Sequence, residues 1–389
     1  MKTHAARFDA ILHHPEEYQV QIVYTQIDRD AQNRPHFQTF RYGVDPQLYY
    51  YPASTVKMPA AFLAMEKLNK LAVKGLDKDA VMKTGAASAP QTAVEADTTA
   101  AGGLPSVGHY VKKIFVVSDN DAYNRLYEFL GQQYFNEQLH AKGFNDTRII
   151  HRLSVSGFDP EANRHTNPVS FYKNGQLLYH QGEVYSNGFS ELTLRKQQQG
   201  KGWLNDNTGQ VVPEPFDFSY KNYVSLDNLH DMLQAIMFPQ DVPKQQRFDL
   251  TEADYRFLYQ CMSVLPAESK HPRYDDYEHY PDGYGKFFLY GDTTARIPSN
   301  IRIFNKVGYA YGFLTDVAYI VDFEKGVEFL LAANIRVNAN GIFNDGKYET
   351  ESIGIPFLAH LGRAVYEYET KRIRTYRPDL SRFMVGPYR

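Results

Sequence analysis

Apolar and polar residues alternate with a period of two most clearly near the two ends of the chain. Residues 20–30 and 36–43 alternate on either side of a polar turn, which predicts a hairpin. Three more segments, 300–312, 313–323 and 326–337, have the composition of strands separated by short turns. The pattern therefore predicts one antiparallel sheet built from both chain ends.

Through the middle of the chain, apolar residues recur at helical spacing instead. Residues 55–71 predict a buried helix with an early kink at Pro59, because proline lacks a backbone donor. Residues 108–131 predict two helices separated by a polar break at 118–121. Further helices are predicted at 8–18, broken near Pro15, and at 225–237, 251–264 and 352–372.

These elements define an α+β fold, with a five-stranded antiparallel sheet flanked by helices and a mostly helical subdomain inserted into it. We expect a single domain over residues 1–389. Residues 1–53 and 296–389 form the predicted sheet subdomain, and 54–295 the helical one.

Residues 154–224 interrupt the helical pattern. They are rich in Gly, Asn, Gln and Pro, which predicts a long excursion from the core, with a hairpin around 177–188. Its tyrosine-rich part, 172–222, is a candidate contact surface should the protein bind a partner rather than catalyse a reaction.

Composition narrows the classes of partner. The 42 Lys and Arg residues nearly balance 45 Asp and Glu, giving a net charge of −3, so we expect neither nucleic acid nor an anionic membrane as a partner. No run of about 18 apolar residues predicts a membrane span. The 13 His are scattered and Cys261 is alone, so neither a metal nor another cofactor is expected.

The stretch YYYPASTVKMPAAFLA, residues 49–64, places Ser54 and Lys57 three positions apart at a predicted helix start. Residues i and i+3 lie on one face of a helix, so the amine can reach the hydroxyl, and the first N–H groups are free to face an oxyanion. Lys57 can act as a base if its apolar surroundings lower its pKa. Alone, the pair is either a nucleophile with its base or the polar edge of a buried helix.

A second motif, Ser118-Asp119-Asn120, lies in the break between two predicted helices. There a hydroxyl and an amide can point into a cleft. The alternative is a helix cap, with Asn120 or Asp121 as the N-cap of the second helix.

A third motif, Lys306-Val307-Gly308, lies in a predicted strand. Gly308 permits close approach of a ligand to the backbone. A lone lysine on a strand usually faces solvent, so this motif indicates a functional site only in combination with the other two.

Taken in order, these motifs resemble the S-x-x-K, S-D-N and K-T-G motifs of class A β-lactamases and penicillin-binding proteins. The resemblance covers roughly residues 8–153 and 223–370 and implies the β-lactamase/transpeptidase-like fold. It implies that Ser54 is acylated and that Lys57 accepts its proton. It makes Ser118 the hydroxyl that passes a proton to the leaving nitrogen, and Asn120 a ligand for the substrate's amide. Lys306 supplies positive potential beside Ser118.

The resemblance also implies an oxyanion hole made by the backbone N–H groups of Ser54 and Tyr309, with Val307 and Gly308 as substrate-binding positions. Val307 replaces the family's Thr, and a valine cannot donate the hydroxyl hydrogen bond that a substrate carboxylate receives, a loss of about 1 to 3 kcal/mol. Thr315, on the adjoining predicted strand, is either a substitute donor or an ordinary strand residue.

A second departure concerns release of the acyl group, for which the family uses a Glu in an E-x-E-L-N run. The nearest string here, residues 158–163, has Asp159 at the place of that Glu. Aspartate is one methylene shorter and would hold a hydrolytic water less well. Asp159 is therefore either a weak general base or part of an Asp-Pro turn.

The predicted function is a serine hydrolase that forms an acyl-enzyme at Ser54 on an amide or ester, with β-lactam hydrolysis as the expectation from the family. A D-alanyl peptidase or an esterase is the alternative within that class, acting on a peptidoglycan-derived peptide or an ester. A binding protein that keeps the pocket without turnover is the alternative outside it. The resemblance implies a periplasmic or secreted protein, although residues 1–14 lack the apolar run of a signal peptide.

Overall fold

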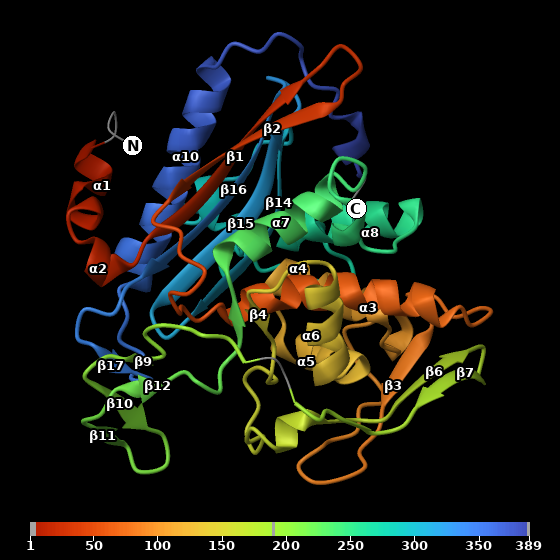
Figure 1. Cartoon of the computed structure of the whole chain (residues 1–389). Helices are drawn as coiled ribbons and strands as arrows, with labels where there is room; N and C mark the ends of the chain where they lie inside the picture. Colours follow the sequence, from red (N-terminus) through yellow and green to blue (C-terminus); the bar gives the residue numbers. More distant parts are fainter. Residues whose placement is uncertain (1–4, 189–190, 387–389) are drawn as a thin grey trace.

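The computed structural model describes residues 5–188 and 191–386, and its largest sheet has five antiparallel strands in the order β14-β15-β16-β1-β2 (Figure 1). The N-terminal strand β1 pairs with the C-terminal strand β16, with Gln21 opposite Asn334. The sheet built from both chain ends is therefore confirmed. The strands are β1 (Gln21–Arg29), β2 (Pro35–Tyr42), β14 (Ile301–Ala310), β15 (Phe313–Asp322) and β16 (Val327–Arg336).

Both faces of this sheet are covered, so its central strands β15 and β16 are buried along nearly their whole length. Alternate residues of β14 join different apolar clusters: Ile303 packs on the side of α10 (Ile355–Lys371), and Phe304 on the side of α7 (Leu226–Met237) and α8 (Glu252–Ser263). Figure 1 shows α10 on one face and α7 on the other. Lys306 and Gly308, two and four residues after Phe304, therefore lie on the helical face of the sheet.

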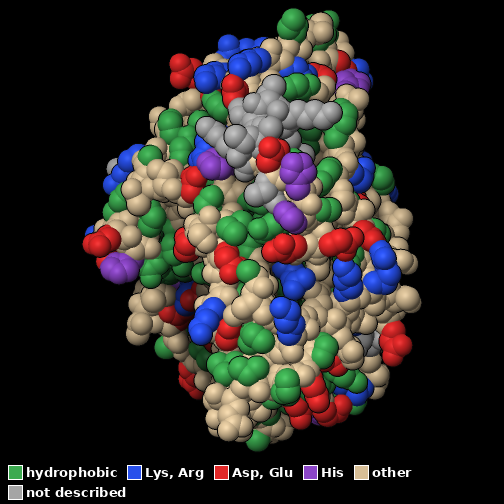
Figure 2. Space-filling view, turned by 90° about the vertical axis from the view of Figure 1, so that its left-hand side faces the viewer, with side chains coloured by type: hydrophobic (Ala, Val, Ile, Leu, Met, Phe, Trp, Pro, Cys, Tyr) green, Lys and Arg blue, Asp and Glu red, His purple; other side chains and the backbone are tan. Residues whose placement is uncertain are grey.

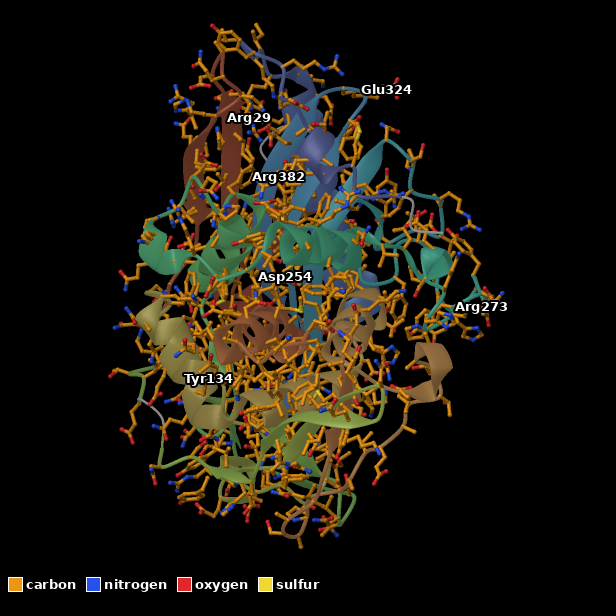
Figure 3. All side chains as sticks on the ribbon, turned by 90° about the vertical axis from the view of Figure 1, so that its right-hand side faces the viewer. Arg29, Tyr134, Asp254, Arg273, Glu324 and Arg382 are labelled. Carbon is orange, nitrogen blue, oxygen red and sulfur yellow. The ribbon has the colours of Figure 1, made fainter. Side chains whose placement is uncertain are left out.

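Helices α3 (Lys57–Leu71), α4 (Val107–Val117), α5 (Asn120–Leu130) and α6 (Gln132–Ala141) form the other half of the molecule. Figure 3 shows this division, with Tyr134 among these helices, Arg29 in the sheet, and Asp254 at the start of α8 between them. Although α7 and α8 fall within the predicted helical subdomain, α7 contacts β15, β16 and β1, and α8 contacts both α4 and β14.

The predicted kink at Pro59 is not found, because α3 begins at Lys57 and runs to Leu71. Pro59 is the third residue of that helix, and its missing N–H would have had no partner within the first turn. A turn of 3-10 helix, η2 (Ala53–Val56), precedes α3 and carries Ser54.

The excursion at 154–224 is built from short strands and turns rather than helices. Its hairpin lies slightly earlier than predicted, because β6 (Val169–Lys173) pairs with β7 (Gln176–Gln181) across a turn at Asn174 and Gly175. Farther along, Phe216 and Phe218 pack in an aromatic cluster with Tyr49 and Tyr51. The excursion is thereby fixed to the segment directly before Ser54.

The remaining elements are short. The helices are α1 (Ala5–Leu12), α2 (Pro15–Tyr18), α9 (Phe287–Tyr290), η3 (Ala101–Gly103), η4 (Ala162–Arg164), η5 (Lys244–Gln246), η6 (Pro266–Glu268), η8 (Ser381–Phe383) and a π-helical turn η7 (Thr350–Gly354). The strands are β3 (Val81–Thr84), β4 (Thr147–Arg148), β5 (His165–Thr166), β8 (Val184–Tyr185), β9 (Gln198–Gln199), β10 (Gly202–Asn205), β11 (Gln210–Val212), β12 (Phe216–Asp217), β13 (Tyr223–Val224) and β17 (Ile342–Phe343).

Charged side chains of both signs are interspersed on the face shown in Figure 2, as the small net charge leads one to expect. Over the described ranges, no helix combines the length and the apolar character needed to cross a membrane.

Candidate active site

Ser54 lies on η2, directly ahead of the long helix α3, and lines a cavity of about 1790 Å³. The preceding residue, Ala53, is buried and has a positive φ of 46°, a conformation that costs a non-glycine residue energy and that clusters at functional sites. Because Ser54 is at the start of a helical segment, its N–H has no partner within the helix. The local fold thus places Ser54 at the cavity wall, with an N–H that its own helix does not use.

Lys57 is fully buried, one turn after Ser54. Its Nζ donates to the backbone carbonyl of Ser118, to Ser118 Oγ at 3.2 Å and to Asn120 Oδ1 at 2.7 Å. Burial lowers its pKa to about 7, and the negative charge of Asp119 opposes that shift. Loss of one proton would free a lone pair on Nζ, as a base requires.

Ser118 lies between two lysines. Its Oγ accepts from Lys57 at 3.2 Å and from Lys306 at 2.8 Å. Ser118 ends α4 in the left-handed region, with a φ of 59°, and this bend turns its carbonyl toward Lys57. The cap of the next helix, α5, is Asp119, whose side chain accepts from the Ala122 N–H at 2.7 Å. The predicted cap at Asn120 or Asp121 is therefore wrong, and Asn120 is free to accept from Lys57.

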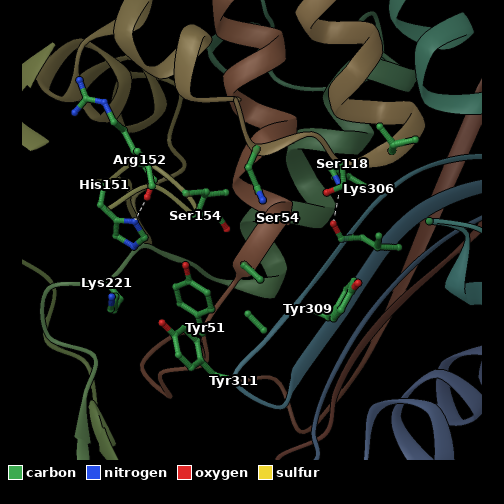
Figure 4. Close-up of a pocket in the computed structure, with 18 of the residues that line it drawn as sticks. Tyr51, Ser54, Ser118, His151, Arg152, Ser154, Lys221, Lys306, Tyr309 and Tyr311 are labelled. Atoms are coloured by element: carbon green, nitrogen blue, oxygen red, sulfur yellow. Dashed lines mark hydrogen bonds between the residues drawn. The ribbon is translucent and has the colours of Figure 1, made fainter. Parts of the chain in front are cut away.

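Lys306 is buried on β14 and also donates to the carbonyl of Val307 at 2.7 Å. Burial and the nearby charge of Lys57 lower the pKa of Lys306 well below its ordinary value. Two ammonium groups around one hydroxyl repel each other, so the arrangement disfavours the state in which both are charged. Figure 4 shows Ser118 and Lys306 joined by this hydrogen bond beside Ser54.

Gly308 brings β14 against the helix start. A Cβ at this position would lie 2.5 Å from the Pro52 carbonyl and 2.8 Å from the backbone nitrogens of Ser54 and Thr55. Only glycine permits this approach. The sequence predicted that Gly308 would let a ligand come close to the backbone, and the close neighbour in the structure is the backbone of η2. Tyr309, the next residue, is 58% exposed and lines the cavity with Ser54.

Val307 lines the cavity, but its side chain belongs to the apolar cluster on the α10 side of the sheet. The structure does not bring Thr315 to the cavity. Thr315 is fully buried opposite Gly308 in the β14–β15 ladder, and its hydroxyl donates to Asn334 at 3.2 Å. Thr315 therefore does not substitute for the hydroxyl missing at Val307, because its own hydroxyl is used within the sheet.

Asp159 lines the same cavity from the excursion and is exposed. Its Oδ1 accepts from the Ala162 N–H at 2.7 Å, which makes a turn leading into η4. The side chain of Asn163 braces this loop by accepting from the Arg152 N–H at 3.0 Å and donating to the Phe158 carbonyl at 3.1 Å. The structure thus contains the Asp-Pro turn and also places its carboxylate at the cavity wall.

No motif in the sequence identified several of the residues that line the cavity. His151, Lys221, Tyr51 and Tyr311 line its other side, away from Ser118 and Lys306 (Figure 4). They come from separate segments and match no short motif. Only the aromatic richness of the sequence hinted that part of this wall would be aromatic.

A buried polar network lies behind the strand of Lys306 and was also not anticipated. Lys286 donates to Asn305 at 2.7 Å, and Asn305 donates to Asp316 at 2.8 Å. Burial lowers the pKa of Lys286 to about 7 and raises that of Asp316 to about 6. The network holds β14 to α9, because Asp316 also accepts from the Phe288 N–H at 3.1 Å.

Within the described part of the chain, no group of three or more His, Cys, Asp or Glu side chains is arranged to hold a metal ion. The groups that the site brings together are the hydroxyls of Ser54 and Ser118 and the two buried amines of lowered pKa, those of Lys57 and Lys306.

The chain belongs to the beta-lactamase enzyme family, whose model matches residues 4–212, more than half of the sequence. The match includes Ser54, Lys57 and the Ser118 motif. Lys306 lies beyond the matched range, and the fold brings it to the same site. Membership of this family indicates a serine hydrolase with β-lactamase-like activity.

No curated protein matches the sequence. Among solved structures, the chain is similar to a beta-lactamase from Sphaerobacter thermophilus, with 12% identity, 95% of this chain and 98% of that chain covered, and a TM-score of 0.48. It is also similar to a beta-lactamase from Xanthomonas campestris, with 13% identity, 92% and 96% covered, and a TM-score of 0.48. The assignment of the chain to the beta-lactamase enzyme family depends on the match to the family model and not on these structural similarities.

Proposed function

We propose that the protein is a serine hydrolase that cleaves an amide or ester through an acyl-enzyme at Ser54. The Ser54 hydroxyl gives its proton to the neutral amine of Lys57 as Oγ bonds to the substrate carbonyl carbon. The backbone N–H groups of Ser54 and Tyr309 stabilise the resulting oxyanion. When the intermediate collapses, the bond to the leaving group breaks, and Ser118 passes that group a proton. Ser118 recovers a proton from Lys57.

The observation that carries this proposal is the position of Ser118 Oγ between two buried lysines, 3.2 Å from Lys57 and 2.8 Å from Lys306. A hydroxyl with an amine on each side can accept a proton from one neighbour as it donates its own. The lowered pKa of Lys57, about 7, supports the role of that residue as the proton acceptor, because a neutral amine is then available near neutral pH.

Incubation with a fluorescent penicillin, followed by intact mass, tests the proposal. An adduct on the wild type that is absent in Ser54→Ala supports acylation at Ser54. Rapid turnover of a chromogenic cephalosporin would further identify a β-lactamase. If neither β-lactams nor activated esters acylate the wild type, the protein is a binding protein that keeps the pocket, and the proposal fails.

A D-alanyl peptidase or an esterase is the second candidate, favoured by two observations. Val307 offers no hydroxyl for the carboxylate of a β-lactam, and Thr315 does not replace it. The carboxylate of Asp159 is exposed and engaged in a turn. A stable penicillin adduct together with turnover of a D-alanyl-D-alanine peptide or a simple ester would favour this candidate. A peptidase for cell-wall peptides would act in the periplasm or outside the cell.

A further inference from the structure

The cavity around Ser54 is larger than a small substrate needs. Its volume of about 1790 Å³ exceeds the roughly 300 to 1,000 Å³ that is typical of small-molecule sites. Figure 4 shows Ser118 and Lys306 on one side of Ser54, and His151 and Lys221 on the other. The groups on the second side have no task in the acylation proposed above.

Lys221 differs from the other Lys and Arg residues that line the cavity. Arg152 pairs with Glu128 at 3.0 Å, and Arg164 pairs with Glu161 at 2.9 Å. Lys306 uses two of its three donors on Ser118 and Val307.

Lys221 Nζ makes no hydrogen bond or ion pair with any residue in the described ranges. Its ammonium group lies 6.0 Å from the centroid of the Phe216 ring.

The surroundings of Lys221 leave its charge uncompensated. Burial is the one cause of its lowered pKa, with no carboxylate near enough to oppose it. His151 is its neighbour, and burial together with the charge of Lys221 lowers the pKa of His151 to about 4. The imidazole is therefore neutral near pH 7, and its Nδ1 donates to the Arg152 carbonyl. A half-buried cation without a counter-ion is poised to bind an anion.

The wall beside Lys221 is aromatic. The rings of Tyr51 and His151 are nearly parallel, with centroids 6.2 Å apart, and Tyr311 meets Tyr51 edge-on at 5.2 Å. These flat side chains can pack against an apolar chain that leads from Ser54 toward Lys221. At the other side of the site, Val307 gives no hydroxyl to a carboxylate.

We propose that Lys221 binds a carboxylate on the acyl part of the substrate, remote from the bond cleaved at Ser54. The acyl part is assigned to this side because Ser118, which protonates the leaving group in the proposed mechanism, lies on the opposite side. This inference rests on the proposed function. It predicts a preference for acyl donors that carry a terminal carboxylate at the end of an apolar chain.

Two esters of equal length test it: mono-4-nitrophenyl suberate and its methyl ester, in which the terminal carboxylate is masked. We expect the ratio of their kcat/KM values, acid over methyl ester, to fall about tenfold in Lys221→Met, mainly through a higher KM for the acid. The control is Lys201→Met, which removes an exposed lysine of the same excursion that does not line the cavity, and there the ratio should stay at the wild-type value. An unchanged ratio in Lys221→Met would overturn the proposal.

A binding measurement separates this proposal from the hydrolase itself. Ligand-observed NMR with 4-phenylbutyrate and uncharged 4-phenylbutyramide requires no turnover. We expect the acid to bind about tenfold more tightly than the amide to the wild type and to Ser54→Ala, and equally to Lys221→Met. If Ser54→Ala hydrolyses the esters as fast as the wild type does, the proposed mechanism at Ser54 fails. The binding measurement still shows whether Lys221 binds a carboxylate. Equal binding of acid and amide to the wild type would remove the site.

Discussion

The two sides of the cavity differ in how their polar groups are held. On one side, Lys57, Ser118 and Lys306 come from segments far apart in the sequence, are joined by hydrogen bonds of 3.2 and 2.8 Å, and have both amines buried. In the rest of the cavity wall, to which Asp159 and Lys221 belong, Asp159 is exposed on a turn and Lys221 has no polar partner in the described part of the chain. We call the first the rigid side, because its groups bind one another before a substrate arrives. We call the second the open side, because a substrate can supply the partner that Lys221 lacks.

This difference assigns different steps of the reaction to the two sides. Preorganised groups contribute most to a step whose charges develop at fixed positions, as in attack by Ser54. Recognition of the acyl chain and placement of a hydrolytic water depend on the second side. Substitutions on the first side should therefore change acylation strongly, and those on the second should change selectivity and release of the acyl group.

The largest effect is expected for Lys57→Met, which keeps the volume of the side chain and removes the proton acceptor. Acylation by a penicillin or an activated ester should slow by about 10² to 10⁴, the usual contribution of a well-placed general base. Stopped-flow or timed intact mass measures it. Lys70→Met, on the exposed end of the same helix, should acylate at the wild-type rate. A Lys57→Met protein that is acylated as fast as wild type would remove Lys57 from the mechanism.

The next largest effect is expected for Gly308→Ala. The added methyl would lie 2.5 Å from the Pro52 carbonyl and 2.8 Å from the Ser54 nitrogen, so β14 or η2 must move. We expect acylation to slow roughly 100-fold, because a shift of about 1 Å near the reacting atoms can have that cost. The melting temperature should also fall. Gly182→Ala, where a Cβ meets nothing within 4 Å, is the matched control. Normal acylation in Gly308→Ala would show that the close approach is not needed for catalysis.

The third effect is a pH dependence of acylation. Since burial lowers the pKa of Lys57 to about 7, its amine is mostly protonated below that pH and mostly neutral above it. The rate should rise about tenfold per pH unit below pH 7 and level off above it. The same shift sets the sign of the effect on stability. Between pH 7 and about 10.5, Lys57 carries a proton in the unfolded chain but not in the folded one. The contribution of Lys57 to the free energy of unfolding therefore rises with pH over this range. A rate that is flat from pH 5 to 8, with the protein folded throughout, would contradict a Lys57 base.

The rigid side of the site could be predicted from the sequence, because its motifs depend on local rules. A helix start places Ser54 and Lys57 on one face, and a break between helices exposes Ser118. The strand pattern correctly placed the three C-terminal strands and the two N-terminal strands in one sheet. The resemblance implied that Lys306 lies beside Ser118, but the strand pattern alone did not, because that position depends on how β14 packs against η2 and on how α4 and α5 pack against α3.

The open side could not be predicted, since its residues share no local pattern. Lys221 is a candidate anion-binding residue because no carboxylate lies near it, and this depends on how distant segments fold together. The sequence left Thr315 open between a substitute donor and an ordinary strand residue, because the strand period gives the face of a side chain but not whether that face reaches a cavity. Pro59 was misread as a kink because the exact first residue of a helix is the least certain part of a sequence pattern.

The smallest effect, and the sharpest test of the difference between the two sides, concerns Asp159. Its carboxylate is exposed and accepts from the Ala162 N–H, so it should activate water less well than a fully placed base, which contributes about 100-fold or more. We expect Asp159→Asn to lengthen the lifetime of the penicillin adduct about threefold to tenfold, and Asp159→Glu, which adds the missing methylene, to shorten it. Intact mass after removal of free penicillin measures both.

Glu161→Gln provides the control for Asp159, because Glu161 lines the same cavity and pairs with Arg164 on the same loop. Its adduct lifetime should equal that of the wild type. If both Asp159 variants also keep the wild-type lifetime, the excursion does not activate the hydrolytic water. The base for release must then come from the rigid side, where Lys57 is the group with a pKa near 7 one turn from Ser54, and a single amine would serve both halves of the reaction.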